Sequence, residues 1–564
     1  MAIHYPSHLL RVIVPILATF MVMLTAFTSE FKLSPQNIAI YAGAALAAWI
    51  VEGWASKLAP TYLALYGNHW ASLEDIRPQF LTKRQTERGV LLGYAYGRRF
   101  GILPGAAGRK ELGNVLVVAP SRRGKGLQLV SNLLTWKGSA VVVDIKGENF
   151  ERTAGHRAKM GQRILVLDPA GYGNRYDPFA ELSTDEGLNA IATMILEPDK
   201  DGSNRAFALR AGSVLFAMMK AATLEKKAVL RAVREYTAMG MIGCVQALGT
   251  VQDEEVRRRL VDFLGNRPED IDWGEIGGDK FLNNSWQGMI AKLNPFFSKG
   301  ILAMTAGSDF TALDLVRQPT TLYLVFRESD LRFTGAALRM VLLGMVNALM
   351  RSFDAGERSA VETLFAFDEA GTVVVPDLDR FVATAAGRGI VSMIYLQDLP
   401  QLETIYGRAA AATIRANCHT QVYYKPLEFV TASYISDMLG KRAVVDTRYA
   451  QHSNQPGVGE GFGLRARELM SASEVTQLPL DRCIAFVDVV SGSYPVMLHR
   501  MEPWFVPGYA RATALPPPAL ALLPGLTFSD VPARSPAKRP KARKGKPRFE
   551  DLEDEDSFND PFED

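Results

Sequence analysis

Short apolar runs alternate with helical stretches through the middle of this 564-residue chain. The apolar runs predict strands at residues 114–119, 139–144, 162–169, 320–326, 364–367 and 390–396. A helical pattern, LQLVSNLL at residues 127–134, separates the first two. Strands that alternate with helices form parallel sheets covered on both faces. The pattern therefore predicts an α/β domain built from residues 114–181 and 310–512.

The pattern changes between residues 182 and 309, which are poor in β-branched runs and rich in Ala, Leu, Met and charged residues. This composition predicts an all-α domain inserted into the α/β domain. Residues 60–113 are mixed and polar, with aromatic residues and glycines between them. We interpret them as a connecting module that leads into the α/β domain.

Two long apolar runs occur near the N-terminus, at residues 9–28 and 38–51. A helix needs about 20 apolar residues to cross a bilayer. Residues 1–59 are therefore predicted to form a two-helix transmembrane hairpin with spans at about 9–28 and 36–54. A cleaved signal peptide followed by one anchor, and a hairpin buried in a soluble protein, are the alternatives.

The last 52 residues, 513–564, change composition twice. Proline and small residues come first, then a basic block at residues 534–548 and an acidic block at residues 550–564. Such a composition cannot build a core, so a disordered tail is predicted. A docking tail and a solubilising tail are both open interpretations. The formal net charge of +3 is too small to indicate a polyanionic partner, and the three cysteines show no disulfide or zinc spacing.

The first candidate for chemistry is NVLVVAPSRRGKG, residues 114–126, an apolar strand that runs into a glycine-containing loop and a helix. Such a loop can direct backbone N–H groups and the Lys125 ammonium at phosphates. The common pattern G-x-x-x-x-G-K-[ST] is modified at both ends, because Ala119 replaces its first glycine and Gly126 its magnesium-binding hydroxyl. The predicted phosphate-binding residues are Pro120, Ser121, Arg122, Arg123, Gly124, Lys125 and Gly126.

The second candidate is the apolar strand TLFAF, which ends in Asp368 and Glu369. A nucleoside triphosphatase needs one carboxylate to hold Mg²⁺ and another to polarise the attacking water. Gln397 ends the run at residues 390–396 and could contact the γ-phosphate or that water. Together these residues predict an ATP-hydrolysing protein.

The order of segments resembles the VirD4/TraG group of type IV secretion coupling proteins. The resemblance extends from Trp70 to about Pro503. It rests on APSRRGKG, DIKGENFERTAGHRAKMG followed by LDP, FAFDEAG, GRGI, YLQDLPQLETIYG and RELMSASEVTQLPLDRCIAFV. Members of this group often carry GKG, so the Gly126 departure supports the resemblance.

The resemblance implies a RecA-like P-loop ATPase that uses ATP and Mg²⁺. It implies that Lys125 holds the β- and γ-phosphates, that Asp368 binds Mg²⁺ and that Glu369 is the general base. Arg388 would be an arginine finger offered to a neighbouring subunit, and Gln397 a γ-phosphate sensor. A structural ion pair for Arg388 and a satisfied strand-end amide for Gln397 are the competing interpretations. Asp144 and Lys146 match a motif of the group, but no role follows from the sequence.

The resemblance also implies partners and a location. These are the bacterial inner membrane, with the catalytic domain in the cytoplasm, a homo-hexameric ring and the components of a type IV secretion channel. The substrate would be a relaxase bound to DNA (the relaxosome) or a protein effector, and DNA, single- or double-stranded, would be gripped through phosphates without sequence readout. The alternatives are a coupling protein for protein effectors only and a DNA translocase of the FtsK/HerA kind.

Overall fold

The computed structural model describes residues 68–71, 81–82, 89–95, 98–102, 113–197, 202, 204–357, 359–451, 458–487, 495–506 and 508–532. Both predicted membrane spans lie outside these residues. The chain divides into two compact units. The larger contains residues 70–435 and 472–544, and the smaller contains residues 1–69, 436–471 and 545–564.

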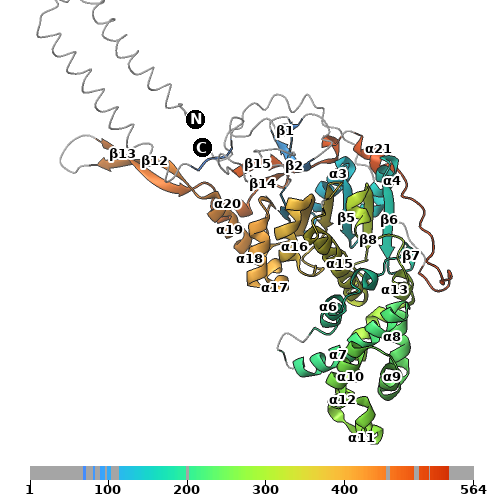
Figure 1. Ribbon diagram of the computed structural model, residues 1–564. Helices are drawn as coiled ribbons and strands as arrows, with labels where there is room; N and C mark the ends of the chain where they lie inside the picture. The colour runs from blue at the N-terminus through green and yellow to red at the C-terminus, as the bar shows by residue number, and fades with distance from the viewer. Residues whose placement is uncertain are drawn as a thin grey trace, which may run out of the picture. The chain divides into compact units, whose positions relative to one another are not determined.

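A 13-stranded sheet forms the centre of the larger unit in the described residues, in the order β1-β3-β2-β15-β14-β11-β4-β10-β9-β5-β8-β6-β7 (Figure 1). Seven strands from β11 to β6 are parallel. They are β11 (Thr420–Tyr424), β4 (Val115–Val118), β10 (Ile390–Leu396), β9 (Thr363–Phe367), β5 (Ser139–Asp144), β8 (Thr320–Val325) and β6 (Arg163–Asp168). The predicted parallel α/β sheet is therefore confirmed, and the central strands are buried because nearly all their residues are apolar.

Antiparallel strands extend this sheet at both ends, which the sequence did not predict. They are β14 (Arg482–Val487), β15 (Pro495–His499), β2 (Val90–Ala95), β3 (Arg98–Ile102) and β1 (Leu81–Thr82) at one end, and β7 (Tyr172–Gly173) at the other. Three of these strands come from residues 60–113. The connecting module therefore contributes strands to the sheet.

The connections between parallel strands decide which face each helix covers. The chain moves one way along the sheet from β4 to β5 to β6, and the opposite way from β8 to β9 to β10 to β11. Right-handed crossovers then place the connecting helices of these two paths on opposite faces. The first path contains α3 (Lys125–Thr135) and α4 (Glu148–Lys159), and the second contains α15 (Leu331–Asp354), α16 (Leu378–Ala385), α17 (Leu399–Tyr406) and α18 (Arg408–Asn417). Helix α21 (Tyr509–Ala514) packs on α3 and α4.

Arg157 of α4 connects the end of α3 to the starts of the neighbouring strands β5 and β8. Its side chain is fully buried, and its guanidinium donates five hydrogen bonds of 2.6–2.9 Å, none of them to a carboxylate of the described residues. The acceptors are Thr321 Oγ1, Gln162 Oε1 and the carbonyls of Leu133, Trp136 and Gly138. Burial lowers the pKa of Arg157 to about 10, which still leaves the group charged at neutral pH. This residue therefore satisfies carbonyls at the end of α3 and in the turn before β5.

Eight helices occupy the range predicted for the all-α insertion in the described residues. They are α6 (Asp185–Ile195), α7 (Arg205–Leu224), α8 (Val229–Ala238), α9 (Gly240–Gly249), α10 (Glu254–Leu264), α11 (Trp273–Gly278), α12 (Lys280–Leu293) and α13 (Lys299–Met304). Helix α7 packs against α6, α8, α9, α10 and α12. Helices α7 and α15 are long and apolar enough to cross a membrane, but 56% and 67% of their most apolar windows is buried inside the protein. Core packing accounts for their composition.

Short helices complete the larger unit. They are α5 (Pro178–Glu181), α14 (Asp314–Arg317), α20 (Ala472–Thr476) and the 3₁₀ segments η3 (Pro268–Asp270), η4 (Asn294–Phe297), η5 (Ala386–Arg388) and η6 (Pro503–Phe505). Helix α19 (Phe429–Leu439) runs across the division between the two units. In the smaller unit, β12 (Lys441–Gln451) and β13 (Val458–Glu468) form an antiparallel pair. Residues 436–471 therefore lie outside the α/β domain in which the sequence placed them.

The predicted tail also starts later than expected. The Gly173 N–H donates to the Ala521 carbonyl, and the Leu523 N–H donates to the Gly171 carbonyl. The Leu523 side chain is buried. The prediction of a disordered tail from residue 513 is wrong for residues 513–532, because this segment pairs with the sheet edge at β7. Residues 533–564 lie outside the described residues.

Candidate functional site

The predicted phosphate-binding loop connects β4 to α3. The Ala119 N–H donates to the Leu396 carbonyl over 2.9 Å, which ties the start of the loop to β10. Gly124 precedes α3 with φ of 114°, a conformation that only glycine adopts without strain. No side chain caps this helix among the described residues, so its first N–H groups are available to an anion.

Lys125 and Glu369 form a buried ion pair across the sheet. Lys125 is the first residue of α3, and Glu369 follows β9 with φ of 76°. The Lys125 Nζ to Glu369 Oε2 distance is 2.5 Å, and the two side chains are only 10% and 7% exposed. Glu369 Oε1 is buried and has no hydrogen-bond partner among the described residues. A buried carboxylate oxygen without a donor is costly, so this arrangement fits a site that receives a further donor such as water.

Asp368 lies beside this pair and is held by an amide. Its Oδ2 accepts a 2.9 Å hydrogen bond from Asn149 Nδ2. Burial is the main cause that raises the pKa of Asp368, and the Asn149 bond and the Lys125 charge oppose that rise. A nearby cation would favour the charged form of this carboxylate.

Asp144 ends β5 and caps the N-terminus of α4. Its Oδ2 accepts from the Phe150 N–H at 2.8 Å, and its Oδ1 accepts from the Lys146 N–H at 3.3 Å. Complete burial raises the pKa of Asp144 to about 7, and the backbone hydrogen bond from Phe150 works against that rise. The geometry gives Asp144 a clear structural role as the residue that fixes the start of α4.

These elements enclose a cavity of about 440 Å³, which is within the size range of small-molecule sites. It is lined by Ser121, Arg122, Gly124, Lys125, Gly126, Val130, Ile145, Lys146, Glu148, Asn149, Arg152, Asp368 and Glu369. Seven of these belong to the predicted site. The sequence missed the contribution from the loop after β5 and from α4, residues 145–152, although an acidic strand end followed by glycine, DIKGEN, was the available signal.

The other predicted residues do not line this cavity. Pro120 and Arg123 belong to the loop but lie outside the lining. Gln397 follows β10 on the same sheet edge, and its backbone N–H donates to Gln401 Oε1 at 3.2 Å. Arg388 precedes β10, and seven strand residues separate it from Gln397, roughly 23 Å. The side chain of Arg388 therefore lies near the opposite edge of the sheet from the cavity.

The surroundings of Arg388 are partly apolar. Its guanidinium lies 5.3 Å from the centre of the Phe353 ring, and Nη2 is 3.5 Å from Asp354 Oδ1. Nη1 is buried without a hydrogen-bond partner among the described residues. Because Asp354 is 61% exposed, this ion pair is weak. Arg388 Nη1 thus carries N–H donors that no acceptor among the described residues uses.

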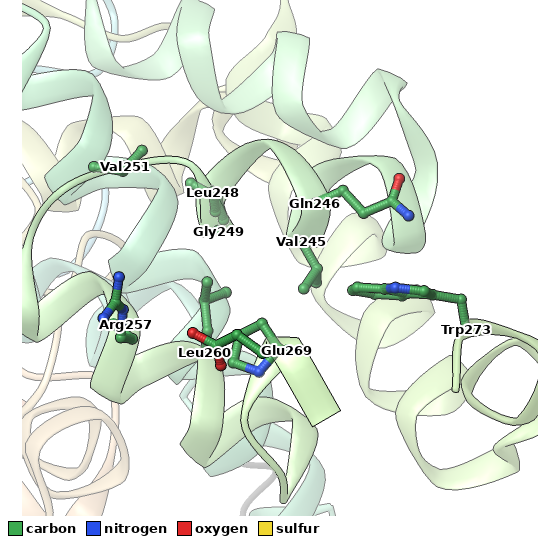
Figure 2. Close-up of a pocket in the computed structure, with 10 residues that line it drawn as sticks. Val245, Gln246, Leu248, Gly249, Val251, Arg257, Leu260, Glu269 and Trp273 are labelled. Carbon is green, nitrogen blue, oxygen red and sulfur yellow. The ribbon is translucent and has the colours of Figure 1, made fainter. Parts of the chain in front are cut away.

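A second cavity, of about 220 Å³, lies in the all-α insertion between α9, α10, η3 and α11. Figure 2 shows the Trp273 indole pointing toward Val245, with Arg257 and Glu269 on the other side. Most of its lining is apolar. It contains no lysine with a carboxylate pair, so the first cavity is the candidate for phosphate chemistry.

The fold and the first cavity together define a class of protein. A parallel sheet carries a glycine-containing loop after β4, a lysine at the start of α3 and two carboxylates after β9, which are the elements of an α/β P-loop nucleoside-triphosphatase fold. The solved structure of the bacterial conjugative coupling protein TrwBdeltaN70, in an unbound form, has a TM-score of 0.52 and 17% identity, and the match covers 75% of this chain and 92% of the solved chain. TrwB in complex with ADP and Mg²⁺ gives a TM-score of 0.51 at 16% identity and covers 77% and 94%. These likenesses support the fold.

Sequence relatives identify the family. A family model described as "Type IV secretory system Conjugative DNA transfer" matches residues 69–507. The conjugal transfer protein TraG of Escherichia coli is 28% identical over 530 residues, which cover 81% of this chain and 79% of TraG. Protein VirD4 of Agrobacterium fabrum is 26% identical over 392 residues, which cover 66% of this chain and 56% of VirD4. The chain belongs to this conjugative DNA-transfer family and is a coupling protein of the VirD4/TraG type.

Proposed function

We propose that this coupling protein is an ATPase that hydrolyses ATP to deliver relaxase-bound DNA or protein substrates to a type IV secretion channel. The observation that carries the proposal is the meeting of Lys125, Asp368 and Glu369 in one cavity beside an uncapped helix N-terminus. A non-enzymatic scaffold would have no need for a buried lysine between two carboxylates.

The residues of the cavity fit ATP with Mg²⁺. The N–H groups at the start of α3 and the Lys125 ammonium would hold the β- and γ-phosphates. Asp368 would bind Mg²⁺, and Gly126 offers no hydroxyl to help it. The metal, when bound, would neutralise charge on the phosphates. Glu369 would orient and deprotonate the attacking water once Lys125 turns from Glu369 to the phosphates.

Arg388 would act on the nucleotide of a neighbouring subunit. Its distance from its own cavity rules out a direct contact within one chain, and its unused donors suit phosphate oxygens. Subunits packed head to tail would bring the Arg388 edge of one sheet to the cavity edge of the next. A closed ring, as in a homo-hexamer, satisfies every site in this way. Gln397, at the cavity edge, would sense the γ-phosphate.

The sequence and the relatives support a location for this protein. The predicted spans at about 9–28 and 36–54 would anchor the protein in the bacterial inner membrane, with the α/β domain in the cytoplasm where ATP is available. TraG is named as a conjugal transfer protein, which favours a DNA-protein substrate. The proposed partners are a relaxase with its DNA and the components of the secretion channel.

The test is the ATPase activity of the full chain in detergent, with and without single-stranded DNA. Lys125→Ala and Arg388→Ala should each abolish DNA-stimulated turnover, while Arg231→Ala, an exposed arginine on α8, should leave it unchanged. Mixing the two inactive variants should restore part of the activity, because some interfaces would then combine an intact Lys125 with an intact Arg388. Turnover that is indifferent to DNA would contradict the DNA motor and favour a protein-effector receptor. A mixture that stays inactive would contradict the action of Arg388 in a neighbouring subunit.

A further inference from the structure

Asn149 connects the two buried carboxylates of the nucleotide cavity. Its side chain lies in the first turn of α4 and the residue is 3% exposed. Asn149 Nδ2 donates to Asp368 Oδ2 at 2.9 Å and makes a longer contact of 3.4 Å with Asp144 Oδ1. One amide nitrogen therefore serves two carboxylates that come from different strands, β5 and β9.

The chemistry of this contact fixes the orientation of the amide. Asn149 Nδ2 is the donor in both contacts, so the NH₂ group and not the carbonyl of Asn149 faces the two carboxyl groups. The two N–H groups can then be shared between Asp144 and Asp368. This arrangement places a hydrogen-bond donor beside two buried carboxyl groups that raise each other's pKa when charged.

Asn149 is itself held in place by the backbone of α4. Asp144 fixes the start of this helix through the N–H groups of Lys146 and Phe150. Asp144 belongs to the central strand β5, which pairs directly with β9, the strand that carries Asp368. The position of the Asn149 amide relative to Asp368 is therefore set by the sheet.

We propose that Asn149 is a positioning residue for Asp368, and that it directs Oδ1 of this carboxylate toward a divalent cation on the nucleotide. The hydrogen bond occupies Oδ2, and Oδ1 makes no hydrogen bond within the described residues. A carboxylate with one oxygen held and one free is oriented for binding a metal through the free oxygen, directly or through water. The inference rests on the proposed role of Asp368 as the magnesium-binding residue.

A departure in the phosphate loop makes this orientation important. Gly126 stands where a serine or threonine hydroxyl would hold Mg²⁺. With that hydroxyl missing, Asp368 would be the main protein ligand of Mg²⁺. A poorly oriented Asp368 would then weaken Mg²⁺ binding without a hydroxyl at position 126 to compensate. Partners that hold a ligating carboxylate contribute about 10- to 100-fold in metal affinity.

The test compares Asn149→Asp, Asn149→Ala and Asp368→Asn with the unaltered full chain. A fluorescent ATP analogue is titrated with Mg²⁺ at equilibrium, and its binding is also measured in EDTA. We expect the half-saturating Mg²⁺ concentration to rise about 10- to 100-fold in Asn149→Asp. We expect a smaller rise in Asn149→Ala. Asn149→Asp is nearly isosteric and adds a third carboxylate, whereas Asn149→Ala leaves a cavity; a merely structural role of the side chain predicts the reverse order.

The controls separate this inference from the proposed function. Asn284→Asp makes the same chemical change on the exposed surface of α12 and should leave the Mg²⁺ dependence unchanged. Thermal unfolding in EDTA reports whether α4 is still folded. A large Mg²⁺ shift in Asp368→Asn with no shift in folded Asn149→Asp would overturn the positioning role alone. No shift in Asp368→Asn would overturn the proposed magnesium site and with it this inference.

Discussion

Replacement of Lys125 by methionine tests the buried ion pair at the centre of the proposed site. Methionine keeps much of the side-chain volume and removes the charge. Glu369 would then lose the donor to Oε2, while Oε1 already has none among the described residues. Leaving one partner of a buried pair unpaired costs about 3–5 kcal/mol, and solvent screening is small because both side chains are at most 10% exposed.

The double variant Lys125→Met/Glu369→Gln should recover part of this loss. Glutamine removes the uncompensated charge, so the double variant is expected to be about 2 kcal/mol more stable than Lys125→Met alone. The assay is chemical unfolding of the nucleotide-free protein, followed by tryptophan fluorescence and circular dichroism. Glu369→Gln completes the double-mutant cycle.

Nucleotide binding gives an independent readout of the same change. An ATP analogue at 100 times its dissociation constant should stabilise the unaltered protein by about 2.7 kcal/mol. We expect no such stabilisation in either variant that lacks Lys125, because its ammonium would hold the phosphates. The reasoning would be refuted if Lys125→Met unfolded like the unaltered protein, or if the double variant were no more stable than Lys125→Met.

Three further predictions address the metal, the core and pH. Gly126→Ser should lower the half-saturating Mg²⁺ concentration for nucleotide binding, because the serine hydroxyl restores a common magnesium ligand. The added side chain fits, since no atom outside its own helix backbone lies within 4 Å of the new Cβ. An unchanged Mg²⁺ dependence would contradict this prediction. Arg157→Met should destabilise the protein by about 3–5 kcal/mol in chemical unfolding, because five acceptors lose a donor in a buried place, and a loss below 1 kcal/mol would contradict this. Asp177 caps α5, and burial is the main cause that raises its pKa from 3.8 to about 6. The folded protein therefore holds the proton of Asp177 more tightly than the unfolded chain does. The stability gained from this proton is fully present below pH 3.8 and is lost as the pH rises through 6. The free energy of unfolding should therefore fall by roughly 3 kcal/mol more between pH 3.8 and 7 in the unaltered protein than in Asp177→Asn.

The sequence indicated the parallel sheet and one half of the cavity because both depend on local patterns. An apolar run that ends in a glycine-containing loop with Lys125, and another that ends in Asp368 and Glu369, can each be recognised within about a dozen residues. The parallel packing of β4, β10 and β9 then brings them to one edge.

The other half of the cavity required the strand order. In the sequence, Asp144 and Lys146 match a motif without a derivable role, and Asn149 is one polar residue in a helical pattern. Only the pairing of β5 with β9 brings Asn149 within 2.9 Å of Asp368, a residue 219 positions away in the chain. Neither spacing nor composition encodes that contact.

The domain boundaries also depended on the sheet and not only on local composition. Residues 513–532 have the proline-rich composition of a tail, yet Leu523 is buried beside β7 because a sheet edge offers unpaired backbone groups to any nearby chain. Residues 81–102 read as a connecting segment and instead add strands β1, β2 and β3 to the sheet.

The sequence by itself indicated a phosphate-binding loop and an acidic strand end, because both are short-range patterns with a direct physical purpose. The tertiary structure decided how these parts are held: it placed Asn149 between two carboxylates and paired Lys125 with Glu369 in a buried place. It also separated Arg388 from its own cavity by the length of β10. These relations depend on strand order and direction, which arise from long-range packing of apolar faces that no local stretch of sequence specifies.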